Sequence, residues 1–405
     1  MPPRLHAAPA AGPVPQEVLD DLSRRFAATA ADFDRQAVFP QPNFLALHDA
    51  GLLGLTVETA LGGRGAGLGE ALRVLRAVAR GEPSTALILF MTYCTFADSS
   101  AEPASRAGRW PRHLYERVAR EAATEMSLIG TLRVEPELGT PVRGGLPKTV
   151  ARATPEGWRL SGHKIYSTGS TGLRWFAVWA RTDEPTPRVG TFLVRSDSPG
   201  IRVEPAWDHL GMRASVSHEV VFEDALTPLD HAVDVRKPAE WAAQAAQKAG
   251  GLAAWNALAI STIYGAVAEA ARDWLVGYLN QRTPSNLGAP LATLPRVQEK
   301  VGEIEALLHT NRILLDTTTR RAESSDPGER PTPVENNLVK YTTTRNAIRA
   351  VEIGLELTGN PGLSRHNPLE RHYRDVLCSR IHSPQDDTIL ISAGWSALTR
   401  AASPP

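Results

Sequence analysis

Cysteine is scarce in this 405-residue chain, which contains only Cys94 and Cys378. The two residues lie far apart and have no metal-ligand spacing, so a disulfide framework and a zinc ribbon are both excluded. Such sparing use of cysteine suits a reducing cytoplasm, which is the localisation we expect. No other metal-binding pattern is present, and no metal site is predicted.

Net charge is also missing, because 44 Lys and Arg residues balance 44 Asp and Glu residues. A neutral chain has no overall attraction to nucleic acid, and we expect no nucleic-acid partner. Residues 1–14 are rich in Pro and Ala and lack a continuous apolar run. They are interpreted as a flexible tail and not as a signal peptide.

One uncharged stretch, residues 249–268, raises the question of a membrane span. Small and polar residues such as Gly250, Asn256 and Tyr264 interrupt it, and it contains many alanines but few leucines. That composition favours a helix buried inside a bundle over a helix facing lipid. No membrane span is predicted.

The common catalytic fingerprints are absent. Walker A, HExxH, GxSxG and CxxC patterns do not occur, which removes support for P-loop, zinc-hydrolase and serine-esterase chemistry. Gly63, Gly65 and Gly67 do not form a dinucleotide fingerprint, because no strand leads into them and Leu68 follows. They are interpreted as a surface turn.

Three compositional regions follow one another and predict an α+β fold. Residues 15–120 show apolar residues at helical spacing and form an N-terminal helical domain. Residues 121–232 contain short segments rich in β-branched and aromatic residues, which predict a middle antiparallel, barrel-like β-domain. Residues 233–405 are rich in Ala and Leu and predict a C-terminal four-helix bundle. The predicted strands include 158–160, 175–180, 189–194 and 219–222, and the predicted bundle helices are 241–281, 295–323, 334–358 and a last one after Pro384.

Five segments, in this order, resemble the acyl-CoA dehydrogenase superfamily. They are AGLLGLTVETALGGRGAG (50–67), VEPELGTP (134–141), GWRLSGHKIYSTG (157–169), HLGMRASVSHEVVFEDALTP (209–228) and NPLERHYRDVLCSRIHSP (367–384). Each motif alone is weak, but their order and their spread over nearly the whole chain are specific. The resemblance implies the three-domain fold above, a bound flavin, and a homotetramer or homodimer held by the C-terminal helices.

The resemblance also implies which residues hold the flavin, in a cleft between the β-domain and the helices. Candidate cofactor-binding residues are Val134, Glu135, Thr140, Tyr166, Ser167, Thr168, Arg282 and Gly359. Arg282 stands where the family has an arginine for the cofactor pyrophosphate; it could equally cap the end of a helix. Ser167 and Thr168 could instead be strand-end hydroxyls that satisfy a turn.

The sequence departs from the family at the catalytic base. A dehydrogenase of this family needs a carboxylate to remove the α-proton of an acyl thioester. Ser383 replaces the usual Glu after the Arg374-Asp375 pair, and no acid lies near Trp255, the other place where a Glu occurs. Another base is then required, and the candidates are His382, Asp386 and Asp387.

Other departures concern the adenine end of the cofactor. A glutamine of the family is missing at two places, where Pro295 and Glu356 stand instead, which weakens the case for FAD and leaves FMN open. The same departures resemble the monooxygenase branch, which includes dibenzothiophene monooxygenase and uses reduced flavin from a separate reductase together with O₂. Ser167 and His382 match its active-site positions, although His382 could also be purely structural.

Three hypotheses therefore remain open. The first is a flavin-dependent oxidoreductase that dehydrogenates an acyl-CoA or similar substrate, with an electron-transfer flavoprotein as partner. The second is a two-component monooxygenase that uses reduced FMN or FAD with a flavin reductase as partner. The third is a catalytically inactive helical scaffold.

Overall fold

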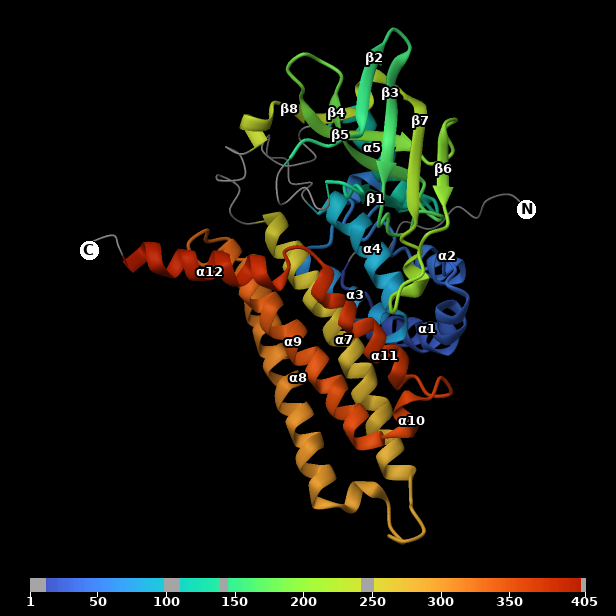
Figure 1. The fold of residues 1–405 in the computed structure, drawn as a ribbon, viewed down its shortest axis with the longest axis vertical. Helices are drawn as coiled ribbons and strands as arrows, with labels where there is room; N and C mark the ends of the chain where they lie inside the picture. Colours follow the sequence, from blue (N-terminus) through green and yellow to red (C-terminus); the bar gives the residue numbers. More distant parts are fainter. Residues whose placement is uncertain (1–11, 98–109, 139–144, 242–250, 402–405) are drawn as a thin grey trace.

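A computed structural model describes residues 12–97, 110–138, 145–241 and 251–401, and it has the predicted order of helices, sheet and helices (Figure 1). Long helices form an elongated bundle. The sheet caps one end of this bundle, and the connection between α7 and α8 lies at the other end.

The N-terminal region contains α1 (Gln16–Gln36), α2 (Gln41–Asp49), α3 (Leu68–Gly81), α4 (Pro83–Phe96) and α5 (Arg112–Thr124). Helix α3 buries Leu68, Leu72 and Leu75, which recur at the spacing of one helical face. Helix α4 is apolar all round and is buried on nearly every side. Its first turn is capped by Glu82, whose carboxylate accepts hydrogen bonds from the backbone N–H groups of Ser84 and Thr85.

The β-domain consists of β1 (Ile129–Leu132), β2 (Val150–Thr154), β3 (Gly157–Lys164), β4 (Trp175–Thr182), β5 (Val189–Arg195), β6 (Ile201–Glu204), β7 (Glu219–Thr227) and β8 (Ala232–Arg236). The strand order is β6-β7-β3-β2-β4-β5-β8. All four predicted strand segments lie within β3, β4, β5 and β7. The sheet is mixed and not purely antiparallel as predicted, because β1 and β2 both pair with β4 in parallel. Strand β8 also extends the sheet beyond residue 232, the predicted end of the domain.

The C-terminal region contains α7 (Gly251–Gln281), α8 (Pro295–Ala322), α9 (Pro333–Thr358), α10 (Asn360–Leu363), α11 (Leu369–Leu377) and α12 (Asp386–Ala401). The described part of the uncharged stretch, residues 251–268, lies in the first part of α7, and residues such as Leu258, Ile263 and Val267 are buried. Within the described ranges, no helix has the length and apolar character needed to cross a membrane.

The three regions meet around Arg374 on α11. Its guanidinium forms two hydrogen bonds of 2.9 and 2.6 Å with the carboxylate of Asp34 on α1, and a third of 2.8 Å with the carbonyl of Leu210 in the β-domain. Next to it, the carboxylate of Asp375 accepts a hydrogen bond from the N–H of Met212. The backbones approach closely here, since a Cβ on Gly211 would lie 2.3 Å from the carbonyl oxygen of Arg374. This contact positions the 209–212 loop against the bundle.

We predict that Asp34→Asn lowers the free energy of unfolding by about 1–3 kcal/mol, because it removes a carboxylate that makes charge-assisted hydrogen bonds. Asp32→Asn is the matched control: Asp32 lies on the same helix and pairs with Arg35, but its side chain is 56% exposed, against 13% for Asp34. The control should change stability by less than about 1 kcal/mol. Urea unfolding of both variants tests this, and equal effects would show that the Arg374 contact is not a special constraint.

Candidate functional site

A cavity of about 780 Å³ lies where the β-domain, α4 and the chain after α11 meet. It is lined by Leu87, Val134, Leu138, Tyr166, Thr168, Trp207, His209, Leu210, Met212, Ser215, Ser217, Leu377, Cys378, Ile381, His382, Ser383 and Gln385. Apolar side chains dominate, with a few polar groups among them. A cavity of this size and lining is typical of a cofactor or small-molecule site.

Five predicted site residues line this cavity: Val134, Tyr166, Thr168, His382 and Ser383. They come from segments far apart in the sequence, and only the fold brings them together. Thr140, a further predicted cofactor contact, lies outside the described residues.

A row of hydroxyl groups forms part of the cavity wall. The hydroxyl of Ser217 lies 3.1 Å from that of Thr168 and 2.8 Å from that of Ser215. Beside them, Ser167 is fully buried, and its Oγ has no hydrogen-bond partner in the described part of the chain. A buried hydroxyl without a partner is unfavourable, but Ser167 is not among the residues that line the cavity.

These groups fit a flavin. An isoalloxazine ring needs apolar packing and hydrogen-bonding groups along its polar edge. Thr168 and Ser217 offer hydroxyls in the cavity, and Val134 and Leu87 offer apolar surface. Ser215 and Ser217 were not predicted as site residues, although both fall within the 209–228 segment that carries the family resemblance.

His382 follows a short 3₁₀ turn, Cys378–Ile381, and its Nε2 lies 2.6 Å from the hydroxyl of Tyr264 on α7. Tyr264 is fully buried, and burial raises the pKa of its hydroxyl well above 10, so the phenol keeps its proton. The O–H can therefore donate to Nε2, and in that arrangement the ring proton of neutral His382 is on Nδ1. Burial, together with the charge of Lys340, lowers the pKa of His382 to about 4. At neutral pH His382 is an uncharged hydrogen-bond donor.

Two further side chains hold the segment that contains His382. The Lys340 ammonium on α9 donates to the carbonyls of His382 at 3.0 Å and Pro384 at 2.8 Å. The amide of Asn256 on α7 donates to the carbonyl of Ser383 at 2.8 Å. Neither Tyr264 nor Lys340 was predicted as a site residue. Both lie in helices with no local motif, so only their tertiary contacts reveal them.

None of the described residues that line the cavity carries a carboxylate. Asp386, a predicted base, does not line it and pairs with Arg345 at 3.5 Å. Asp375 is buried behind the wall, where it bonds to the N–H of Met212, and burial raises its pKa to about 7. The described part of the cavity thus offers no acid positioned to remove a substrate proton.

Three predicted cofactor contacts lie elsewhere. Glu135 is buried inside the β-domain, where its carboxylate pairs with the ammonium of Lys164 at 2.6 Å and accepts hydrogen bonds from Thr149. Arg282 and Gly359 follow α7 and α9 at the end of the bundle remote from the sheet (Figure 1). Arg282 is 18 residues beyond Tyr264, which corresponds to about 27 Å along the helix axis.

Aromatic rings form another part of the cavity wall. The rings of Trp207 and His209 stack with centroids 3.6 Å apart, and Tyr166 meets both edge-on. The indole N–H of Trp207 donates to the carbonyl of Met212, which fixes the stack against the loop held by Arg374. This arrangement presents a flat, uncharged surface to whatever occupies the cavity.

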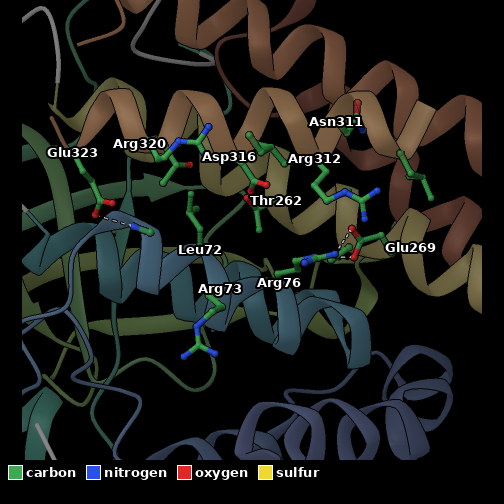
Figure 2. Close-up of a pocket in the computed structure, with 16 residues that line it drawn as sticks. Leu72, Arg73, Arg76, Thr262, Glu269, Asn311, Arg312, Asp316, Arg320 and Glu323 are labelled. Carbon is green, nitrogen blue, oxygen red and sulfur yellow. Dashed lines mark hydrogen bonds and ion pairs between the residues drawn. The ribbon is translucent and has the colours of Figure 1, made fainter. Parts of the chain in front are cut away.

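A second cavity, of about 410 Å³, lies between α3, α7 and α8 (Figure 2). Two of its charged groups pair with each other, since Arg76 forms a bidentate pair with Glu269, and Glu323 accepts a hydrogen bond from the backbone N–H of Gly69. No predicted site residue lines it. Its contacts join the N-terminal helices to the bundle.

Three sequence families match the chain in order. They are described as the N-terminal, middle and C-terminal domains of acyl-CoA dehydrogenase, and they match residues 15–122, 132–225 and 247–385. YdbM of Bacillus subtilis, whose assigned name is that of an acyl-CoA dehydrogenase, is 30% identical over 92% of this chain and 94% of its own. The chain belongs to the acyl-CoA dehydrogenase family.

Two other relatives do not have the name of an acyl-CoA dehydrogenase. L-evernosamine nitrososynthase of Micromonospora is 30% identical over 92% of this chain and 87% of its own. The structure of KijD3, solved in complex with FMN and dTDP-3-amino-2,3,6-trideoxy-4-keto-3-methyl-D-glucose, is 28% identical. The two structures match with a TM-score of 0.80 over 96% of this chain and 95% of KijD3.

We predict that His382 stays neutral down to about pH 5, because its pKa is lowered to about 4. We also predict that its ring proton is on Nδ1, because the hydroxyl of Tyr264 donates to Nε2. The ordinary value of 6.5 applies to the unfolded chain, which therefore binds more protons than the folded chain between these values. Through this group, the free energy of unfolding falls as the pH decreases from about 6.5 towards 4. Nitrogen-15 NMR of labelled histidine tests both points, with His382→Gln to assign the signal. An imidazolium signal for His382 at pH 6.5 would contradict the assignment.

Proposed function

We propose that this protein is a flavin-dependent monooxygenase and not an acyl-CoA dehydrogenase. The observation that carries the proposal is the cavity wall, whose described residues include a neutral histidine, His382, and no carboxylate. Dehydrogenation of an acyl thioester requires a base for the α-proton, and Ser383 cannot act as one. Oxygenation requires hydrogen-bond donors beside the flavin instead, which this cavity offers.

In this proposal the residues of the cavity have separate roles. Thr168 and Ser217 bind the polar edge of the flavin, and Leu87 and Val134 pack against its ring. The chemistry supplied by a bound reduced flavin is the activation of O₂. The Nδ1–H of His382 holds or delivers a proton beside the reacting oxygen, and Tyr264 keeps that nitrogen protonated. The apolar walls exclude water from the site.

We further propose FMN as the flavin, delivered in reduced form by a separate reductase. Two observations support this choice. Each of the two segments that the family uses at the adenine end lacks a glutamine, and a relative 28% identical was solved with FMN. The stacked Trp207–His209 pair and the uncharged wall suit an uncharged organic substrate. Arg282 and Gly359 lie far from the cavity of their own chain. They would therefore reach only a flavin that is bound to a second copy of the chain.

The placement of the flavin predicts that Thr168→Tyr lowers flavin affinity at least about tenfold, because the larger ring fills the cavity beside Ser217 and removes a hydroxyl contact. Thr186→Tyr is the matched control, since Thr186 is exposed on a turn of the same domain. Fluorescence titration with FMN and with FAD measures both variants and identifies the preferred flavin. Equal affinities in the two variants would show that flavin binds elsewhere.

The chemistry predicts that butyryl-CoA does not bleach the oxidised holoenzyme, because no base is available. After the reduced holoenzyme is mixed with O₂, His382→Ala should release hydrogen peroxide on the order of 10²-fold faster than wild type, since a positioned donor has been lost. Asp386→Asn should leave this rate nearly unchanged.

A stopped-flow assay coupled to peroxidase measures the release rate. The dehydrogenase alternative would be established by two results together. Butyryl-CoA would bleach the flavin of wild type but not that of Asp386→Asn, and wild type and His382→Ala would release peroxide at equal rates.

A further inference from the structure

Lys340 is the most unusual charged residue near the cavity. It lies in the middle of α9 with a relative exposure of 0%, and its ammonium donates to two backbone carbonyls. Placing a cation in such an environment is costly, and burial lowers the pKa of Lys340 to about 8. An uncharged side chain could fill the same space at a lower cost. The charge therefore calls for an explanation beyond packing.

The two acceptors of Lys340 identify what it acts on. The carbonyls of His382 and Pro384 belong to the segment that forms one wall of the cavity, and Ser383 lies between them. Lys340 thus bonds to the backbone of a histidine that lines the cavity. It lines no part of the cavity itself.

The charge of Lys340 also acts on the ring of His382. A cation nearby disfavours a second positive charge, and this adds to the effect of burial in lowering the pKa of His382. Lys340 interacts with His382 after α11 and with Asp386 at the start of α12, and Tyr264 from α7 contacts the ring of His382. Asp386 partly compensates the lysine and is paired in turn with Arg345 on α9.

We propose that Lys340 is a positioning residue, which fixes the place of His382 in the cavity wall through the carbonyls of His382 and Pro384 and disfavours the charged form of the imidazole. This inference rests on the proposed function, in which neutral His382 donates a hydrogen bond to the reacting oxygen. A lysine that only braced the fold would support the backbone segment without affecting the protonation of the ring.

Asn256 supplies the matched control. Its amide bonds to the carbonyl of Ser383 in the same segment at 2.8 Å, but it carries no charge. Lys340→Met keeps most of the side-chain volume and removes the charge and both hydrogen bonds. Asn256→Ala removes one hydrogen bond from the segment and leaves the charge in place. Lys340→Arg keeps the charge and the donors.

The experiment follows the titration of His382 in the flavin-loaded protein by nitrogen-15 NMR. In Lys340→Met we expect the titration midpoint to rise by about one pH unit, because a nearby like charge has been removed. In Asn256→Ala the midpoint should stay within about 0.3 units of wild type, since no charge changes, and Lys340→Arg should restore the wild-type midpoint. The acidic side of the pH profile of the peroxide-release rate should shift together with the titration midpoint of His382. An unchanged midpoint in Lys340→Met, or the same rise in Asn256→Ala, would overturn the proposal.

Asp386→Asn keeps the proposal testable if Lys340→Met does not fold. Removing the compensating carboxylate should lower the titration midpoint of His382, whereas Lys340→Met should raise it. A rise of the midpoint in Asp386→Asn would count against the proposal. The NMR readout does not depend on turnover. If the midpoint of His382 shifts in Lys340→Met but butyryl-CoA bleaches the flavin, the oxygenase function alone is rejected. If peroxide release depends on His382 but the midpoint does not shift in Lys340→Met, the role of Lys340 alone is rejected.

Discussion

The contact between Arg374 and Asp34 is the constraint on which the site depends. The guanidinium joins the first helix, the 209–212 loop and α11, and these elements belong to all three regions of the chain. The neighbouring Asp375 ties the same loop through the N–H of Met212. Because Trp207 is in turn bonded to the carbonyl of Met212, the aromatic wall of the cavity is fixed by the same joint. Loss of this contact would free one wall of the site from the other.

A second set of buried polar contacts fixes the part of the wall that contains His382. Tyr264, Asn256 and Lys340 reach the segment after α11 from two long helices, α7 and α9. In an environment that excludes water, each of these groups acts strongly on its neighbours. A phenol that keeps its proton determines the tautomer of His382, and a buried ammonium disfavours the protonated ring. The chemistry of the histidine is thus determined by residues that do not line the cavity.

Much of the fold followed from local patterns. The strand segments in β3, β4, β5 and β7 are rich in aromatic and β-branched residues, and their pattern was sufficient to predict them. Strands β2, β6 and β8 are short and partly exposed, so their side chains carry little signal, and they form only because longer neighbours offer hydrogen bonds. The parallel pairing of β1 and β2 with β4 is a property of topology that no local pattern contains.

The sequence by itself determined the order of helices, sheet and helices, the cavity positions of Thr168 and His382, and the missing acid at Ser383. Each of these rests on residue type or on order along the chain. Only the tertiary structure decided that Glu135 faces Lys164 inside the β-domain and that Lys340 and Tyr264 meet His382. Burial and proximity between distant segments set these interactions, and so they set which groups carry a proton. Neither burial nor the proximity of distant segments can be derived from the type of a residue or from its neighbours along the chain.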